Sequence, residues 1–131
     1  MPIDDALVGR EFPPTEPYPV TEEAVSAFAA AVGVPATTVP PTFPIVVVLP
    51  SLLRLLEDEQ VELARIIHGD QKFAYQRPVA VGDRLTATIS IDTVRHARGN
   101  DIVRTSARVT DAAGDVVCTT SSTLVHLGVV A

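Results

Sequence analysis

Alternation of apolar and polar residues in the second half of the chain constrains the fold more than any other feature of the sequence. Between residues 85 and 92 every second residue is apolar, namely Leu85, Ala87, Ile89 and Ile91. The residues between them are polar, namely Thr86, Thr88, Ser90 and Asp92. Because successive side chains of a strand point to opposite faces, the pattern predicts a strand over residues 84–97 with one buried face.

Three further segments have the composition of strands, and turn signals join the later ones. The segments are residues 64–77, 101–111 and 116–127. Gly99-Asn100 and Ala113-Gly114-Asp115 are typical of hairpin turns, and residues 78–83 form another turn. Strands joined mainly by tight turns predict an antiparallel sheet.

The first part of the chain combines an extended segment with a helix. Residues 10–20 carry four prolines, which favours an extended edge or a polyproline-like segment. Thr21 is expected to cap a helix over residues 22–32, because Glu22 and Glu23 suit a helix N-terminus and the apolar residues recur at helical spacing. Gly33 is the natural end of this helix.

A second, longer helix is predicted over residues 43–59, which are apolar almost all round at first and amphipathic later. Thr42 can cap this helix, with Pro44 in its first turn. Pro50 lacks an N–H group and is expected to kink the helix or divide it in two. A long buried helix against an antiparallel sheet is an α+β arrangement, and we expect a single domain over residues 1–131.

Composition argues against several classes of protein. The net charge of −6 repels phosphate backbones, so we expect no nucleic-acid partner. The N-terminus lacks the features of a secretory signal, and the longest apolar run, Ile45–Leu49, is too short to span a membrane. The single cysteine, Cys118, cannot form an internal disulfide. We therefore expect a soluble cytoplasmic protein.

Several motifs resemble those of one enzyme family. Pro40-Pro41-Thr42-Phe43 precedes the second helix, the block HGDQKFAYQRPV covers residues 68–79, and Gly82-Asp83-Arg84-Leu85 follows it. From about Val8 to Leu127 the chain resembles the MaoC-like dehydratases, and in particular the N-terminal, FAS1-like half of that family. That half includes small actinobacterial subunits of (3R)-hydroxyacyl-ACP dehydratases. The resemblance implies a hot-dog fold, in which an antiparallel sheet wraps around a long helix.

The resemblance also implies a chemistry. Catalytic members add or remove water across a 2-enoyl or 3-hydroxyacyl thioester, with an Asp and a His in a D-x-N-P-x-H segment between the two helices. An acid and a base at this spacing can share one water. The corresponding interval here, residues 33–41, contains no Asp, Glu or His, and it is shortened. We therefore expect no catalytic residue in this chain and a catalytic partner subunit or domain.

Six residues are candidates for binding a thioester: Thr42, Phe43, His68, Gln71, Phe73 and Tyr75. The first two stand at the start of the second helix, where free N–H groups can hold a carbonyl oxygen, although Pro44 removes one donor. The two strand aromatics can line an acyl tunnel or pack in the core. His68 can line a cleft or an interface, or bond to backbone as a strand-edge histidine. In a regular strand, the side chains of Asp70 and His68 point to the same face. A bulge at Gly69 would change which face Asp70 points to.

The remaining polar groups have simpler interpretations. We interpret His96 and His126 as solvated, and the spacing of the histidines predicts no metal site. Cys118 is interpreted as a buried structural thiol. No Gly-rich phosphate loop is present, and we expect no cofactor. Four arginines form either a basic spot for a carrier's phosphate or a solvated strand face: Arg95, Arg98, Arg104 and Arg108.

Three functions remain open. The first is the partner subunit of a (3R)-hydroxyacyl-thioester dehydratase or 2-enoyl-thioester hydratase, which shapes acyl-chain binding for a catalytic hot-dog subunit. The second is a self-contained hot-dog dehydratase that uses His68. The third is an acyl-thioester binding or assembly module without catalysis. The expected ligand is an acyl-ACP or acyl-CoA thioester, and an uncovered sheet edge predicts a heterodimer or a homodimer.

Overall fold

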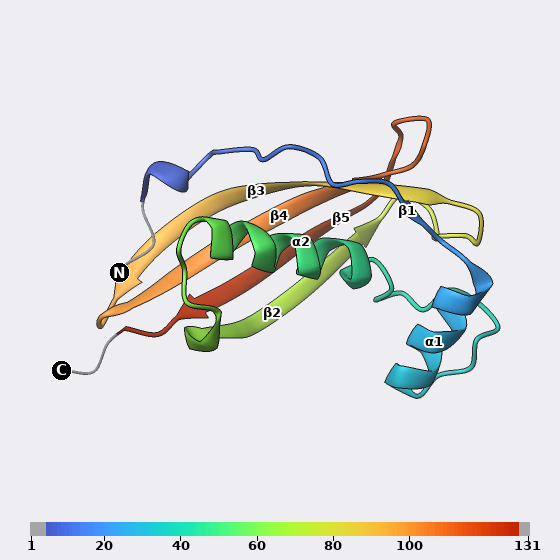
Figure 1. Cartoon of the computed structure of the whole chain (residues 1–131), viewed down its shortest axis with the longest axis horizontal. Helices are drawn as coiled ribbons and strands as arrows, with labels where there is room; N and C mark the ends of the chain where they lie inside the picture. The colour runs from blue at the N-terminus through green and yellow to red at the C-terminus, as the bar shows by residue number, and fades with distance from the viewer. Residues whose placement is uncertain (1–4, 129–131) are drawn as a thin grey trace.

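Five antiparallel strands form one curled sheet in the order β1-β3-β4-β5-β2, and α2 lies across its concave side (Figure 1). The computed structural model describes residues 5–128. Its strands are β1 (Tyr18–Pro19), β2 (Ile66–Tyr75), β3 (Arg84–Ala97), β4 (Asn100–Thr110) and β5 (Val116–His126). Its helices are α1 (Glu22–Val32) and α2 (Ile45–Asp58), with 3-10 turns η1 (Asp5–Leu7) and η2 (Leu63–Arg65). The predicted α+β hot-dog arrangement is confirmed.

Helix α1 has the bounds that the sequence predicts, because both of its ends are set by local signals. Thr21 is extended, and its Oγ1 accepts a hydrogen bond from the N–H group of Ala24 at 3.1 Å. Gly33 ends the helix with φ of +78°, a conformation that glycine adopts without strain. Phe28 packs edge-on against Phe43, so α1 closes the end of the core at which α2 begins.

Helix α2 differs from its prediction at its start, and one of the two outcomes predicted for its proline is excluded. The predicted cap is wrong, because the N-cap is Pro44 and residues 41–44 form a turn in which the N–H group of Ile45 donates to the Thr42 carbonyl at 3.1 Å. The helix also runs unbroken through Pro50, so it is not divided in two. Pro50 is exposed beside an open groove, where water can reach the carbonyl group that lacks an N–H partner.

The strands follow the predicted alternation closely. β3 has the predicted bounds, and its predicted inward residues are at most 4% exposed: Leu85, Ala87, Ile89 and Ile91. β4 begins and ends one residue earlier than predicted, and β5 ends one residue earlier. β2 starts two residues later than the predicted strand over residues 64–77, because residues 63–65 form the turn η2, and it ends two residues earlier, at Tyr75.

Residues 5–20 form an N-terminal strap along the free edge of β3. Its backbone N–H groups donate to β3 carbonyls at 2.8–3.0 Å: Gly9 to Ile91, Phe12 to Ile89 and Thr15 to Ala87. The predicted extended edge is therefore confirmed, and its prolines fall where few ladder hydrogen bonds are needed. A groove of about 560 Å³ separates the strap from α2.

The core lies between α2 and the sheet. The inward stripe of α2 consists of Val48, Leu52 and Leu56, which are at most 3% exposed and repeat at the spacing of one helical face. Phe43 is fully buried just before the helix, with its ring centroid 6.2 Å from that of Tyr18 and 5.5 Å from that of Phe28. Phe43 therefore joins the strap, α1 and α2 in one aromatic cluster.

Candidate binding site

Four of the six predicted residues lie together on the concave side of β2. His68, Gln71, Phe73 and Tyr75 face β5 residues whose side chains are at most 3% exposed: Leu124, Ser122, Thr120 and Cys118. Directly opposite residues of antiparallel strands point to the same face of the sheet. We call His68, Gln71, Phe73 and Tyr75 the concave row. His68 is exposed and the other three are half-buried, so α2 covers the row only in part.

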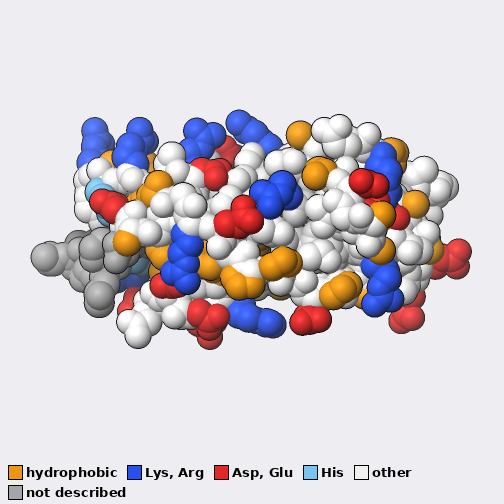
Figure 2. Space-filling view, turned by 90° about the horizontal axis from the view of Figure 1, so that it is seen from above, with side chains coloured by type: hydrophobic (Ala, Val, Ile, Leu, Met, Phe, Trp, Pro, Cys, Tyr) orange, Lys and Arg blue, Asp and Glu red, His pale blue; other side chains and the backbone are white. Residues whose placement is uncertain are grey.

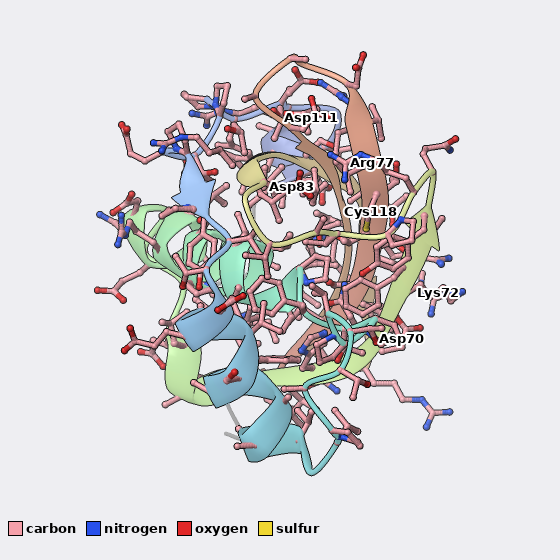
Figure 3. All side chains as sticks on the ribbon, turned by 90° about the vertical axis from the view of Figure 1, so that its right-hand side faces the viewer. Asp70, Lys72, Arg77, Asp83, Asp111 and Cys118 are labelled. Carbon is pink, nitrogen blue, oxygen red and sulfur yellow. The ribbon has the colours of Figure 1, made fainter. Side chains whose placement is uncertain are left out.

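A β-bulge at Gly69 creates this row. His68 faces Leu124 and Asp70 faces Thr123, so β2 has one extra residue between them. Asp70 thereby turns away from the concave row, and its Oδ1 accepts a hydrogen bond from the Thr123 N–H group at 3.1 Å. A Cβ atom at position 69 would lie 3.2 Å from the Thr123 carbonyl oxygen, which favours glycine there. Beyond the bulge, Lys72 points away from α2 (Figure 3).

Gln71 joins His68 to the buried Ser122. Its Oε1 accepts a hydrogen bond from Ser122 Oγ and another from His68 Nε2 at 3.1 Å. Because an amide oxygen only accepts, Nε2 of His68 carries the hydrogen of this bond. Ser122 was not among the predicted site residues. The signal that could have found it is a hydroxyl at a core-facing position of an alternating strand.

Tyr75 fastens β2 to the loop before α2. Its hydroxyl group donates to the Pro41 carbonyl. Burial raises the pKa of Tyr75 to about 12, so the phenol stays protonated at neutral pH and acts as a donor. Beside the ring is a hollow of about 390 Å³ whose lining includes Val39, Pro41 and Val79. The row therefore combines hydrogen-bonding groups at one end with an apolar hollow at the other.

The two residues predicted at the start of the second helix do not join the row. Phe43 lies in the core, and Thr42 is exposed. Three backbone N–H groups of the first turn already donate at 3.0–3.1 Å, from Ile45 to Thr42, from Val46 to Phe43 and from Val47 to Pro44. The expectation of free donors for a thioester carbonyl is therefore wrong for these groups, because the turn before α2 satisfies them.

Residues 33–41 connect α1 to α2 and contribute no acid or base. Residues 33–38 are exposed, and the loop returns to the core at Pro40. The hydrogen-bond partner of His68 is an amide, and none of the carboxylates in residues 5–128 bonds to it. The concave row can thus bind a carbonyl group and an apolar chain, but it lacks the Asp and His pair for general acid–base chemistry.

Arg77, next to the hollow, forms hydrogen bonds with two other segments at the end of the sheet. Its guanidinium group donates to Asp83 at 2.8 and 3.2 Å and to Asp111 at 3.1 Å (Figure 3). These hydrogen bonds hold the pKa of both carboxyl groups below the ordinary value of 3.8. The two carboxylates more than balance the charge of the arginine, which connects three segments at one wall of the hollow.

Two histidines predicted to be solvated are placed differently. His126 is buried, at 5% exposure, and its Nδ1 lies 3.2 Å from the Asp101 carboxylate. His96 is exposed but bonds to Asp101 and Asp5. The interpretation is wrong for His126 because Asp101, its partner, occupies a core-facing position of β4, which pairs with both β3 and β5. Within the described residues, no group of His, Cys, Asp or Glu is arranged to hold a metal ion.

The predicted buried thiol and the four predicted arginines are found in the core and on the surface, respectively. Cys118 is fully buried, and burial raises the pKa of its thiol to about 11, which keeps it protonated at neutral pH. The four arginines are all exposed, and a row of Lys and Arg side chains stands along one edge of the molecule (Figure 2). Arg108 pairs with Glu11 at 3.3 Å. No helix among residues 5–128 is long and apolar enough to cross a membrane.

The sequence of this chain matches a known family. The family described as "FAS1-like, dehydratase domain region" matches residues 6–120. The chain belongs to this family. FAS1-like dehydratase regions therefore include a member with the concave row described above and with no Asp, Glu or His in residues 33–41.

Curated relatives of this FAS1-like chain come from actinobacteria. A "UPF0336 protein" of Saccharopolyspora erythraea is 36% identical over 98% of this chain and 94% of the relative. One of Streptomyces coelicolor is 40% identical over 95% of each chain. The first alignment spans 146 positions, more than the 131 residues of this chain, so the relative has residues without a counterpart here.

Solved structures of hydratases and dehydratases share the fold. A "MaoC-like dehydratase" superposes with a TM-score of 0.83 and 25% identity over 95% of this chain and 43% of that one. The HadBC (3R-hydroxyacyl-ACP dehydratase) complex of Mycobacterium tuberculosis gives 0.76 and 26%, over 95% and 99%. HtdX of the same organism gives 0.78 and 26%, over 90% and 51%. The chain thus spans about half of two of these proteins and the whole of one HadBC subunit.

Proposed function

We propose that this chain is the non-catalytic subunit of a (3R)-hydroxyacyl-thioester dehydratase or 2-enoyl-thioester hydratase of the cytoplasm. Residues 1–131 act as one MaoC-like hot-dog domain that shapes acyl-chain binding for a catalytic hot-dog subunit. The observation that carries this proposal is the combination of the concave row with a connection over residues 33–41 that has no acid and no base.

The concave row supplies the binding side of this role. His68 and Gln71 present polar groups that can position the thioester end of an acyl-ACP or acyl-CoA. Phe73 and Tyr75 continue the row toward an apolar hollow that can hold part of the acyl chain. The partner brings the Asp and the His, which act as acid and base on a water molecule.

The free edge of β2 is the surface that we expect to contact the partner subunit. β2 is the last strand of the sheet and pairs only with β5 among the described residues. Ile67 on this strand is 50% exposed, and the concave row lies beside it. An uncovered strand with an apolar flank favours pairing with another chain. HadBC, which shares the fold over 99% of one subunit, is itself a complex of two subunits.

The alternative function is a binding or assembly module without catalysis. In that case the same edge of β2 would pair with a second copy of this chain. The self-contained dehydratase that uses His68 has less support, because the His68 ring bonds to an amide rather than to a carboxylate. Assembly experiments separate the first two, and activity separates the third.

Charging the free edge of β2 should prevent assembly. In the double variant Ile67→Lys/Ala74→Lys, two exposed positions of β2 gain lysines beside Lys72, and lysine on an edge strand opposes pairing. Binding to a co-expressed hot-dog subunit that carries a D-x-N-P-x-H segment should weaken by about tenfold or more. Size-exclusion chromatography and native mass spectrometry measure the complex.

The matched control is Ala80→Lys/Val81→Lys, which adds the same charge at exposed positions of the turn over residues 78–83. This control should assemble as the wild-type chain does. Equal assembly of the edge variant and the control would contradict the role of the β2 edge. A wild-type chain that stays monomeric with every such subunit would contradict the proposed function, whereas a homodimer would favour the assembly module.

A further inference from the structure

His96 bridges two carboxylates that belong to different parts of the fold. Its Nδ1 lies 2.5 Å from Oδ1 of Asp101 on β4, and its Nε2 lies 2.7 Å from Oδ1 of Asp5 in η1. A carboxylate oxygen accepts hydrogen bonds, so both ring nitrogens must donate at once. Neutral imidazole carries a hydrogen on one nitrogen only, and the bridge therefore requires the imidazolium form.

Asp101 is the fixed end of this bridge. Its side chain is 7% exposed, and its second oxygen accepts a hydrogen bond from Nδ1 of the buried His126 at 3.2 Å. Asp5 is the free end, because its side chain is 71% exposed and no hydrogen bond to it besides that of His96 is found among the described residues. When His96 carries one hydrogen instead of two, the contact with Asp5 is the one that the structure can give up.

Asp5 stands at the start of the N-terminal strap. The strap forms one wall of the groove of about 560 Å³ beside α2, through residues that include Phe12 and Pro14. Leu7 is buried, and Gly9 and Phe12 donate to carbonyl groups of β3. The described charged groups that face His96 are Asp5, Asp101 and, behind Asp101, His126. Arg95 on the same strand faces the other side of the sheet.

We propose that His96 is a pH-dependent latch, which holds the N-terminal strap against the sheet as an imidazolium ion and releases the start of the strap when it loses a proton. The strap that it holds also forms one wall of the groove beside α2, on the side of the helix away from the concave row. The inference stands apart from the proposed function, because it involves none of the residues that bind the thioester or form the β2 edge.

The direction of the pH dependence follows from the two carboxylates. Hydrogen bonds to Asp101 and then to Asp5 raise the pKa of His96 above the ordinary value of 6.5. A raised pKa in the folded state means that the latch is fully closed below the ordinary value. It opens as the pH rises through the raised value. The strap is therefore held most firmly in mildly acidic solution.

An NMR titration tests the first step. The Hε1 and Cε1 shifts of His96 should titrate with a midpoint above 6.5, and the Asp5→Asn variant should lower that midpoint, because the exposed end of the bridge loses its charge. A midpoint at or below 6.5, or one that Asp5→Asn leaves unchanged, would overturn the latch.

Hydrogen exchange tests the second step. Once intrinsic exchange is corrected for pH, the protection of the Gly9 and Phe12 amides should fall about two- to fivefold as His96 deprotonates, in line with the loss of one exposed ion pair. In His96→Gln, which cannot titrate, this dependence should vanish. His68→Gln is the matched control and should keep it. The proposal would be contradicted if the protection of these amides did not depend on pH in the wild-type chain. It would also be contradicted if protection changed with pH equally in His96→Gln.

Discussion

Replacing Phe43 with alanine should lower the free energy of unfolding by about 3–5 kcal/mol, the usual cost of removing a fully buried aromatic ring. Phe43 has no exposed surface, and its ring contacts those of Tyr18 and Phe28 edge-on. Removal of the ring leaves a cavity where the strap, α1 and α2 meet. Urea denaturation followed by circular dichroism measures the change.

The control for Phe43 is Val34→Ala, because Val34 is 45% exposed in the loop after α1 and its truncation should cost less than about 0.5 kcal/mol. A loss below about 1 kcal/mol for Phe43→Ala would show that the ring does not sit in a packed core. That result would favour the prediction that Phe43 binds a ligand.

Replacing Asp101 with alanine should cost about 3 kcal/mol, because one buried carboxylate serves two histidines. In the variant, Nδ1 of the buried His126 loses its acceptor, and its Nε2 already lacks a partner among the described residues. His96 loses its fixed end at the same time. Thermal and urea unfolding at neutral pH measure the effect.

Asp92→Ala is the control for Asp101. Asp92 is an exposed carboxylate of β3 that accepts hydrogen bonds from Ser90 and Ser106, so its loss should cost well under 1 kcal/mol. Equal destabilisation by the two variants would mean that the buried position of Asp101 does not matter. The bridge through His96 would then lack its anchor.

Features that depend on neighbouring residues were predictable from the sequence. The bounds of α1 follow from the cap at Thr21 and the glycine at its end, and both act within one helical turn. The strand β3 follows from its alternation, which needs only a buried face and a solvent face. The missing Asp and His are equally plain, because their absence from residues 33–41 is a property of the sequence itself.

Features that depend on strand register were not predictable. An extra residue at Gly69 exchanges the faces of Asp70 and Gln71, and only the pairing with β5 shows where the bulge falls. Asp101 and His126 read as ordinary polar residues until β4 and β5 are paired, when both prove to be buried. The cap at Thr42 failed for a related reason, since the turn before α2 uses its carbonyl group instead of its side chain.

The most direct test of the account is the hydration of a trans-2-enoyl thioester, followed by the loss of enoyl absorbance. The purified chain alone should show no turnover above the buffer rate, because the concave row has no acid–base pair. The same chain purified with a catalytic hot-dog subunit should give a complex that is more active than that subunit alone. Clear turnover by the isolated chain, retained at equal protein concentration after repeated purification, would contradict the account.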